Sequence, residues 1–196
     1  ISKLFEMINE TTEEAFNLLE NLLRWTRNQN GKTKIYATLF NLTPVARQVV
    51  SLFSAIANAK EIELINRIEG KFDIFADEDM IKTVLRNLIS NAIKFTYTGG
   101  QVELSLADSG DCWTIYVKDN GKGIPKDLQT HLLKSDEYIT TYGTHNEKGS
   151  GLGLILCRDF IRMNKGKLHF CSQEGIGTTF YFTIPKASSS AKAASR

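Results

Sequence analysis

Residues 78–96 read EDMIKTVLRNLISNAIKFT, and this stretch decides the fold. Its apolar residues recur at spacings of three and four, which predicts a helix from about Glu78 to Phe95 with one face in the core. The core-facing residues are Met80, Ile81, Val84, Leu85, Leu88, Ile89 and Ala92. Acidic residues Asp77, Glu78 and Asp79 stand at its start, where the helix dipole favours negative charge.

A polar stripe runs along the other side of that helix. Asn87, Asn91 and Lys94 lie three and four residues apart, so their side chains share one face. Amide oxygens are hard ligands that suit Mg²⁺, and a lysine neutralises phosphate. A solvated helix face would show the same residues, so the stripe indicates a polar ligand only together with other motifs.

Short β-branched and aromatic runs, bounded by turn residues, predict the strands. They cover residues 34–41, 63–68, 71–77, 101–108, 112–119, 167–173 and 178–185, and we expect 63–68 to pair with 71–77 across Glu69-Gly70. Two more helices are predicted, one from Thr43-Pro44 to about Ala59 with Val45, Val49, Leu52, Phe53 and Ile56 inward, and one over 151–163. This order predicts an α/β (α+β) two-layer sandwich, a mixed β-sheet with helices on one face.

The two ends of the chain differ from this central part. Residues 1–30 have apolar residues at helical spacing, which predicts one long N-terminal helix that packs on its own domain or joins a bundle with a partner chain. Residues 187–196 are low in complexity, and we expect them to be disordered.

Composition describes a soluble globular chain of 196 residues, 42% hydrophobic and 23% charged. Its net charge of +2 gives no reason to expect nucleic-acid binding. No apolar run reaches the roughly 20 residues that a membrane span requires. Cys112, Cys157 and Cys171 lack the spacing of metal ligands, and we interpret all three as buried, reduced thiols.

Three glycine-containing motifs follow the helix. They are VKDNGKGIP at 117–125, KGSGLGL at 148–154 and GIGTTF at 175–180. The first ends a strand with a carboxylate, Asp119, that could accept a hydrogen bond from an exocyclic amine such as that of adenine. The second precedes a helix, where backbone N–H groups favour anions. Taken singly, each motif could be an ordinary turn or loop.

In this order, NLISNAIKFT and the three motifs resemble the N, G1, G2 and G3 boxes of the ATPase family shared by histidine kinases, DNA gyrase, Hsp90 and MutL. The resemblance covers about residues 34–186 and implies the Bergerat, or GHKL, fold with ATP and Mg²⁺ as ligands. It implies that Asn91 coordinates Mg²⁺, with Asn87 and Lys94 beside the phosphates. It further implies ATP contacts from Asp119, Gly121, Gly123, Ile124, Lys148, Gly149, Gly151, Leu152, Gly153 and Thr178. The ATP lid would span about 126–148.

Residue 87 separates the branches of this family. The hydrolases usually place a glutamate there as a general base, whereas Asn87 cannot take a proton from water. The sequence therefore favours a sensor histidine kinase, with Asn87, Asn91 and Lys94 as the catalytic residues. A non-catalytic nucleotide-binding module and a gyrase- or Hsp90-type ATPase remain the alternatives.

The kinase resemblance also implies a domain organisation and partners. Residues 1–31 resemble the second helix of a dimerisation domain, 32–43 a linker with the first strand, and 44–186 the catalytic domain. No histidine here has the phosphoacceptor context, so we expect this chain not to phosphorylate itself. The implied partners are a phosphoacceptor-histidine domain, a response-regulator receiver domain and a second copy in a homodimer. We expect a cytoplasmic domain of a membrane-bound sensor, and the stretch GTHNEKGSGLGL resembles hybrid kinases.

Overall fold

The computed structural model describes residues 34–132, 143–145 and 152–186. The chain divides into two compact units, Ile1–Lys34 and Ile35–Arg196, and every described helix and strand lies in the second. The predicted N-terminal helix and the predicted disordered tail lie outside the described residues.

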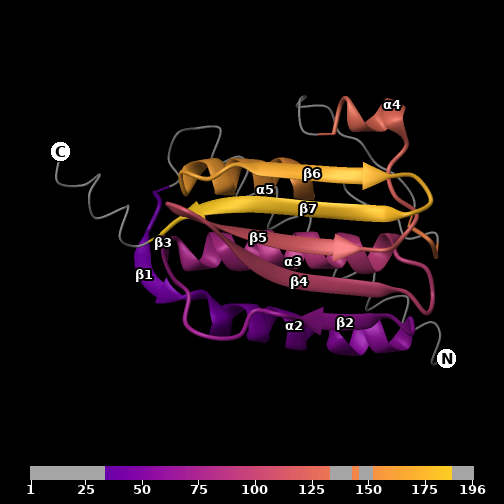
Figure 1. The fold of residues 1–196 in the computed structure, drawn as a ribbon, viewed down its shortest axis with the longest axis horizontal. Helices are drawn as coiled ribbons and strands as arrows, with labels where there is room; N and C mark the ends of the chain where they lie inside the picture. The colour runs from indigo at the N-terminus through magenta and orange to yellow at the C-terminus, as the bar shows by residue number, and fades with distance from the viewer. Residues whose placement is uncertain (1–33, 133–142, 146–151, 187–196) are drawn as a thin grey trace. The chain divides into compact units, whose positions relative to one another are not determined.

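The main sheet has five described strands in the order β2-β4-β5-β7-β6 (Figure 1). They are β2 (Glu63–Asn66), β4 (Gln101–Ser109), β5 (Cys112–Asp119), β6 (Leu168–Gln173) and β7 (Gly177–Pro185). β2 runs parallel to β4, and all other neighbours are antiparallel. The sheet is therefore mixed, as the sequence predicted.

Two further strands, β1 (Thr38–Asn41) and β3 (Asp73–Ala76), form a separate antiparallel pair. The predicted pairing of 63–68 with 71–77 was wrong. Phe72, between them, is bonded through both backbone groups to the start of the helix that follows β1. Phe72 N donates to Asn41 Oδ1 at 3.1 Å, and Leu42 N donates to Phe72 O at 2.9 Å. These bonds direct β3 to β1, and β2 pairs with β4 instead.

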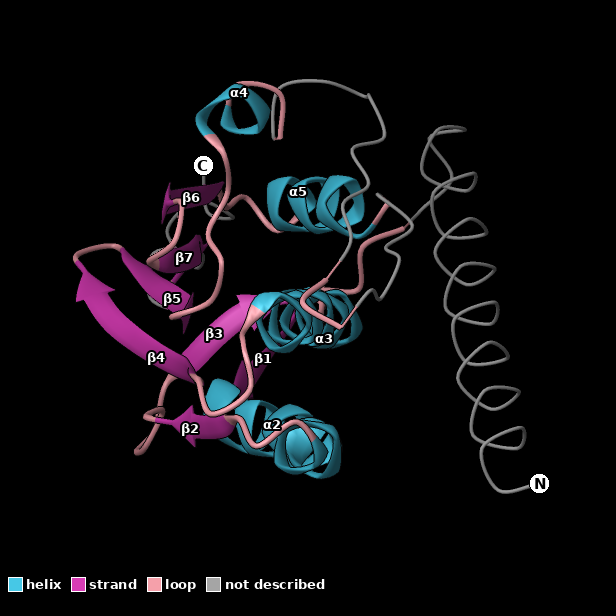
Figure 2. Ribbon diagram, turned by 90° about the vertical axis from the view of Figure 1, so that its right-hand side faces the viewer, coloured by secondary structure: helices cyan, strands magenta, loops and turns pink. Residues whose placement is uncertain are grey.

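Three longer helices cover one face of the main sheet in the described part of the chain (Figure 2). They are α2 (Leu42–Ala59), α3 (Glu78–Phe95) and α5 (Gly153–Met163). A single-turn helix, α4 (Lys126–Gln129), lies beside edge strand β6, where Gln129 Nε2 donates to Ser172 O at 3.3 Å. The predicted two-layer sandwich is confirmed.

The core lies between these helices and the inner face of the sheet. All seven predicted core residues of α3 are buried, and they meet fully buried residues such as Leu104, Ile115 and Phe182. On α2 the prediction was partly wrong, because Leu52 and Ile56 are 55% and 53% exposed. α2 lies at the end of the helical layer beside β2, so only a narrow stripe of it is covered (Figure 2).

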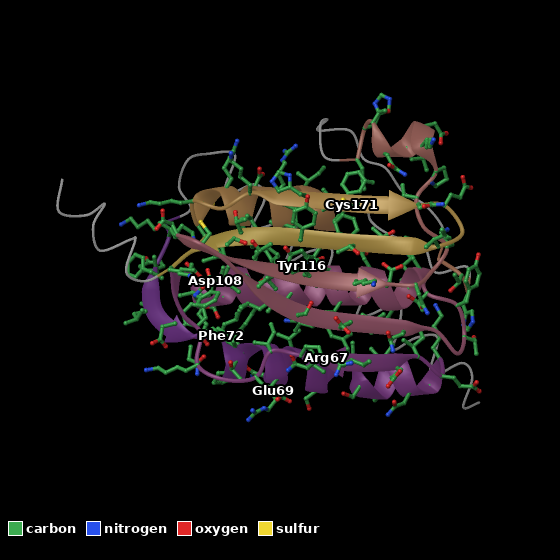
Figure 3. All side chains as sticks on the ribbon, viewed as in Figure 1. Arg67, Glu69, Phe72, Asp108, Tyr116 and Cys171 are labelled. Atoms are coloured by element: carbon green, nitrogen blue, oxygen red, sulfur yellow. The ribbon has the colours of Figure 1, made fainter. Side chains whose placement is uncertain are left out.

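The opposite face of the sheet is open. Tyr116, Tyr181 and His169 stack across three strands there, and Cys171 on β6 is exposed (Figure 3). Cys157 is buried, and burial raises the pKa of its thiol. The expectation that all three cysteines are buried is therefore confirmed for Cys157 and wrong for Cys171, while Cys112 is half-buried. Among the described residues no helix is long and apolar enough to cross a bilayer.

Candidate nucleotide site

The helix α3 is fixed at its start by a buried carboxylate. Asp77 caps it, with Oδ1 accepting from Met80 N at 3.1 Å and Oδ2 accepting from Tyr36 N at 2.9 Å. Asn164, just after α5, accepts from Asp77 N at 2.7 Å. Because α3 and α5 are joined at this end, the residues further along α3 keep a fixed position against α5.

Asn87, the first residue of the predicted polar stripe, lies on the side of α3 that faces α5. Asn87 Nδ2 donates to Thr83 O at 2.9 Å, and a Cβ at Gly153, the first residue of α5, would lie 2.7 Å from Asn87 Oδ1. Glycine at position 153 therefore lets the start of α5 approach the Asn87 side chain. Leu152, which precedes it, is buried. The structure thus brings the N-box helix and the G2 motif together.

Asn91 lies one turn further along. Its side chain is half-exposed and makes no hydrogen bond with the described residues. An amide oxygen without an internal partner fits the hard oxygen ligand that Mg²⁺ requires. Lys94 is half-exposed in the last turn of α3, with Nζ 5.3 Å from the centroid of the Phe95 ring.

Asp119, at the end of β5, is a buried carboxyl group. It is 6% exposed, and its Oδ1 accepts from Gly121 N at 2.9 Å and from Thr178 N at 3.2 Å. Burial raises the pKa of the carboxyl from 3.8 to about 6, although those two hydrogen bonds lower it. Oδ2 takes no hydrogen bond from the described residues, so it can accept one from a ligand.

Two glycines let the loop after Asp119 fit closely. A Cβ at Gly121 would lie 2.1 Å from Phe95 O, at the end of α3. Gly123 has a φ of +68°, and a Cβ there would lie 2.1 Å from Gln173 O. Larger residues would separate this loop from α3 on one side and from the β6–β7 hairpin on the other.

Ser172 was not predicted as part of the site. Its Oγ accepts from Ile124 N at 2.9 Å, donates to Gly177 O at 3.0 Å and lies 2.9 Å from Thr178 Oγ1. It joins the loop after Asp119 to the β6–β7 hairpin. The sequence did contain a signal for it. Leu168, Phe170 and Ser172 alternate along β6 and face inward, and Ser172 is the one polar residue among these three.

The predicted residues thus fall into two groups. Asp119, Gly121, Gly123, Ile124 and Thr178 form one network of backbone and side-chain hydrogen bonds and close packing. Asn87, Asn91 and Lys94 form the other on α3, where Asn87 lies beside Gly153. Lys148, Gly149 and Gly151 lie outside the described residues. No group of three or more His, Cys, Asp or Glu in the described ranges could hold a metal ion.

Comparison with known proteins decides the family. The profile described as "Histidine kinase-, DNA gyrase B-, and HSP90-like ATPase" matches residues 76–188. The chain belongs to this family.

Relatives of this chain include sensor kinases. The adaptive-response sensory kinase SasA of Prochlorococcus marinus is 33% identical over 191 residues, covering 93% of this chain and 48% of SasA. SasA of Crocosphaera subtropica is 28% identical over 186 residues, covering 94% and 48%. The chain therefore spans about half the length of these relatives.

Solved structures similar to this chain also include histidine kinases. The catalytic domain of histidine kinase ThkA has 31% identity and a TM-score of 0.65, covering 76% of this chain and 95% of that one. ThkA in complex with response regulator protein TrrA has 27% identity and a TM-score of 0.70, covering 94% and 52%. This member of the ATPase family thus carries the ATP-binding catalytic domain of the sensor histidine kinases.

Proposed function

We propose that this chain binds Mg²⁺–ATP and transfers its γ-phosphoryl group to a histidine on a dimerisation helix, for relay to a response-regulator aspartate. The observation that supports this best is the juxtaposition of a buried Asp119, whose Oδ2 is open to a ligand, with an α3 face that carries amides at positions 87 and 91.

At the base end, Asp119 Oδ2 accepts a hydrogen bond from the exocyclic amine of adenine. The N–H groups of Gly121 and Thr178 hold Oδ1 and so fix the direction in which Oδ2 points. Since the carboxylate is buried, a ligand donor relieves part of the cost of its desolvation. A purine with a carbonyl at position 6 would place two acceptors against each other.

At the phosphate end, Asn91 is the residue that fits Mg²⁺, because its amide has no partner among the described residues. Bound Mg²⁺ would neutralise charge on the phosphate oxygens. Lys94 would add a positive charge on the same face. Asn87 has no basic group with which to activate water, so ATP is held without rapid hydrolysis until an imidazole nitrogen attacks the γ-phosphorus and ADP leaves.

The partners follow from the same proposal. A histidine-bearing dimerisation domain supplies the nucleophile in a homodimer, and a receiver domain accepts the phosphoryl group; the ThkA complex with TrrA supports a receiver as partner. Residues 1–31 would form part of the dimerisation domain. We further propose that the domain acts in the cytoplasm as part of a membrane-bound sensor.

A phosphotransfer assay tests this function. The chain is incubated with γ-labelled ATP and Mg²⁺, alone and with a histidine-bearing dimerisation domain of a sensor kinase added in trans. We expect label on the added domain that is stable in base and labile in acid, no label on this chain alone, and little free phosphate. Steady release of phosphate without labelled histidine would favour the hydrolase alternative, and no nucleotide binding at all would favour the non-catalytic module.

A further inference from the structure

The C-terminal end of α3 is held by groups from three other parts of the chain. The last carbonyls of a helix lack partners within it and must find them elsewhere. Here Ile93 O and Lys94 O each accept from Lys60 Nζ at 3.0 Å, and Phe95 O accepts from Lys122 N at 3.0 Å. We call the carbonyls of residues 93–96 the α3 terminus.

Lys60, at the end of α2, is only 8% exposed. A buried ammonium requires compensation, and two carbonyl oxygens at the negative end of a helix dipole provide it. The position of this lysine therefore fixes where the last turn of α3 lies against α2. A methionine at position 60 would keep most of the volume but remove the donor.

Thr144 reaches the same carbonyls from the segment between the G1 and G2 motifs. Its backbone N donates to Lys94 O at 3.1 Å, and its hydroxyl lies 2.8 Å from Thr96 O and 3.1 Å from Lys94 O. The next residue continues the contact, with His145 Nε2 3.3 Å from Thr98 Oγ1. Thr144 is thus attached directly to the α3 terminus, and His145 contacts the turn that follows it.

The α3 terminus is also the surface on which the loop after Asp119 rests. Gly121 approaches Phe95 O closely, and the ammonium groups of Lys94 and Lys122 lie 5.3 and 5.0 Å from the centroid of the Phe95 ring. A displacement of this turn would move Lys94 and the loop together. It would therefore disturb both groups of site residues at once.

We propose that Thr144 and Lys60 are positioning residues of the nucleotide site. They hold the α3 terminus so that Lys94 and the loop after Asp119 keep the arrangement that binds ATP. Neither residue is required to touch the nucleotide. This inference rests on the proposed function, because it concerns affinity at the same site.

The test compares Thr144→Val, which removes the hydroxyl and keeps the branched shape, with Thr144→Ser, which restores the hydroxyl. Thr114→Val is the matched control, since Thr114 also has a hydroxyl contact, 2.6 Å to Ser109 Oγ, but lies near the start of β5, far from Asp119. Thr114 is buried and Thr144 is half-buried, so the control substitution is at least as disruptive to packing. Mg²⁺–ATP affinity is measured by calorimetry and thermal unfolding by circular dichroism, for these three variants, Lys60→Met and the unmutated chain.

We expect Thr144→Val to weaken ATP binding about fivefold, as the loss of one hydrogen bond would. Thr144→Ser should bind within about twofold of the unmutated chain, and Thr114→Val should lower the unfolding temperature without changing affinity. Lys60→Met should weaken binding more than Thr144→Val does; if it fails to fold, the threonine variants decide the test.

Unchanged affinity in Thr144→Val, or an equal loss in Thr114→Val, would overturn the positioning role while leaving the ATP site intact. Failure of the unmutated, folded chain to bind ATP would overturn the proposed function itself, and the positioning role with it.

Discussion

The two groups of site residues are built in different ways. Around Asp119, the site consists of loops held together by backbone hydrogen bonds, with Oδ1 accepting two N–H groups and Ser172 joining two segments. On α3 it consists of side chains at helical spacing, and Asn91 has no hydrogen-bond partner among the residues that the structure describes. The first group is therefore organised before ligand binds, whereas the second offers groups that gain partners from the ligand.

This difference predicts that substitutions in the two groups will differ in how their effect on ATP binding depends on Mg²⁺. Removing the Asp119 carboxylate should weaken ATP binding whether or not Mg²⁺ is present, because Mg²⁺ binds the phosphates and Asp119 is proposed to contact the base. Removing the Asn91 amide should matter only with Mg²⁺.

Asp119→Ala should weaken ATP binding about a thousandfold, with or without Mg²⁺, since it removes a charged acceptor and leaves the N–H groups of Gly121 and Thr178 unpaired. Calorimetric titration measures this loss. Asp108→Ala is the control, because Asp108 is an exposed aspartate near the other end of the sheet, paired with Lys186 (Figure 3). A loss confined to titrations with Mg²⁺ would contradict the assignment to the base.

Ionisation of Asp119 should also make the free domain less stable as pH rises. The folded pKa of about 6 lies above the ordinary 3.8, so the folded state holds the proton more tightly. Ionisation of Asp119 therefore lowers the unfolding free energy of the domain. This loss is absent below about pH 4 and complete above about pH 6, where it reaches about 3 kcal/mol.

Urea unfolding at several pH values compares the unmutated chain with Asp119→Asn, which keeps the shape but has no ionisable group. As pH rises from 4 to 7, we expect the unfolding free energy of the unmutated chain to fall relative to that of Asp119→Asn. A constant difference across this range would show that burial does not raise the pKa of Asp119.

Asn91→Ala should weaken ATP binding about thirtyfold with Mg²⁺ and less than about twofold without it, because the lost group is the metal ligand that we propose. The measurement is the same titration with and without a chelator. Asn58→Ala, an exposed asparagine on α2, is the matched control. An equal loss under both conditions would mean that Asn91 contacts the nucleotide itself.

Ser172→Ala should weaken ATP binding about fivefold, since Ile124 N loses its acceptor and the loop is less well held. Ser54→Ala removes a comparable hydroxyl from α2, where it donates to Val50 O, and should leave affinity unchanged. If both variants bind ATP equally well, Ser172 has no part in organising the loop.

The helical part of the site was predictable because periodicity alone places residues on a face. The bounds Glu78–Phe95 and the buried face of α3 follow from apolar spacing, which in turn sets the direction of Asn87, Asn91 and Lys94. The loop around Asp119 was predictable only as a motif. The hydrogen bond that Asp119 Oδ1 accepts from Thr178 N, 59 residues away along the chain, depends on how β5 and β7 pair.

Other features could not be predicted from local patterns. The pairing of β3 with β1 depends on Phe72 and its bonds to the start of α2. The exposure of Leu52 and Ile56 depends on which neighbours α2 has, and apolar spacing does not report that. Ser172, Lys60 and Thr144 act through backbone groups of distant residues, which a sequence motif does not reveal.

The most direct test of the account is a calorimetric titration of the unmutated chain with Mg²⁺–ATP and with Mg²⁺–GTP. The two nucleotides have the same phosphates, but GTP carries a carbonyl where adenine has the amine that Asp119 Oδ2 would accept from. We predict that ATP binds and that GTP binds at least about a hundredfold more weakly. Equal affinity for both would contradict the claim that Asp119 recognises the base.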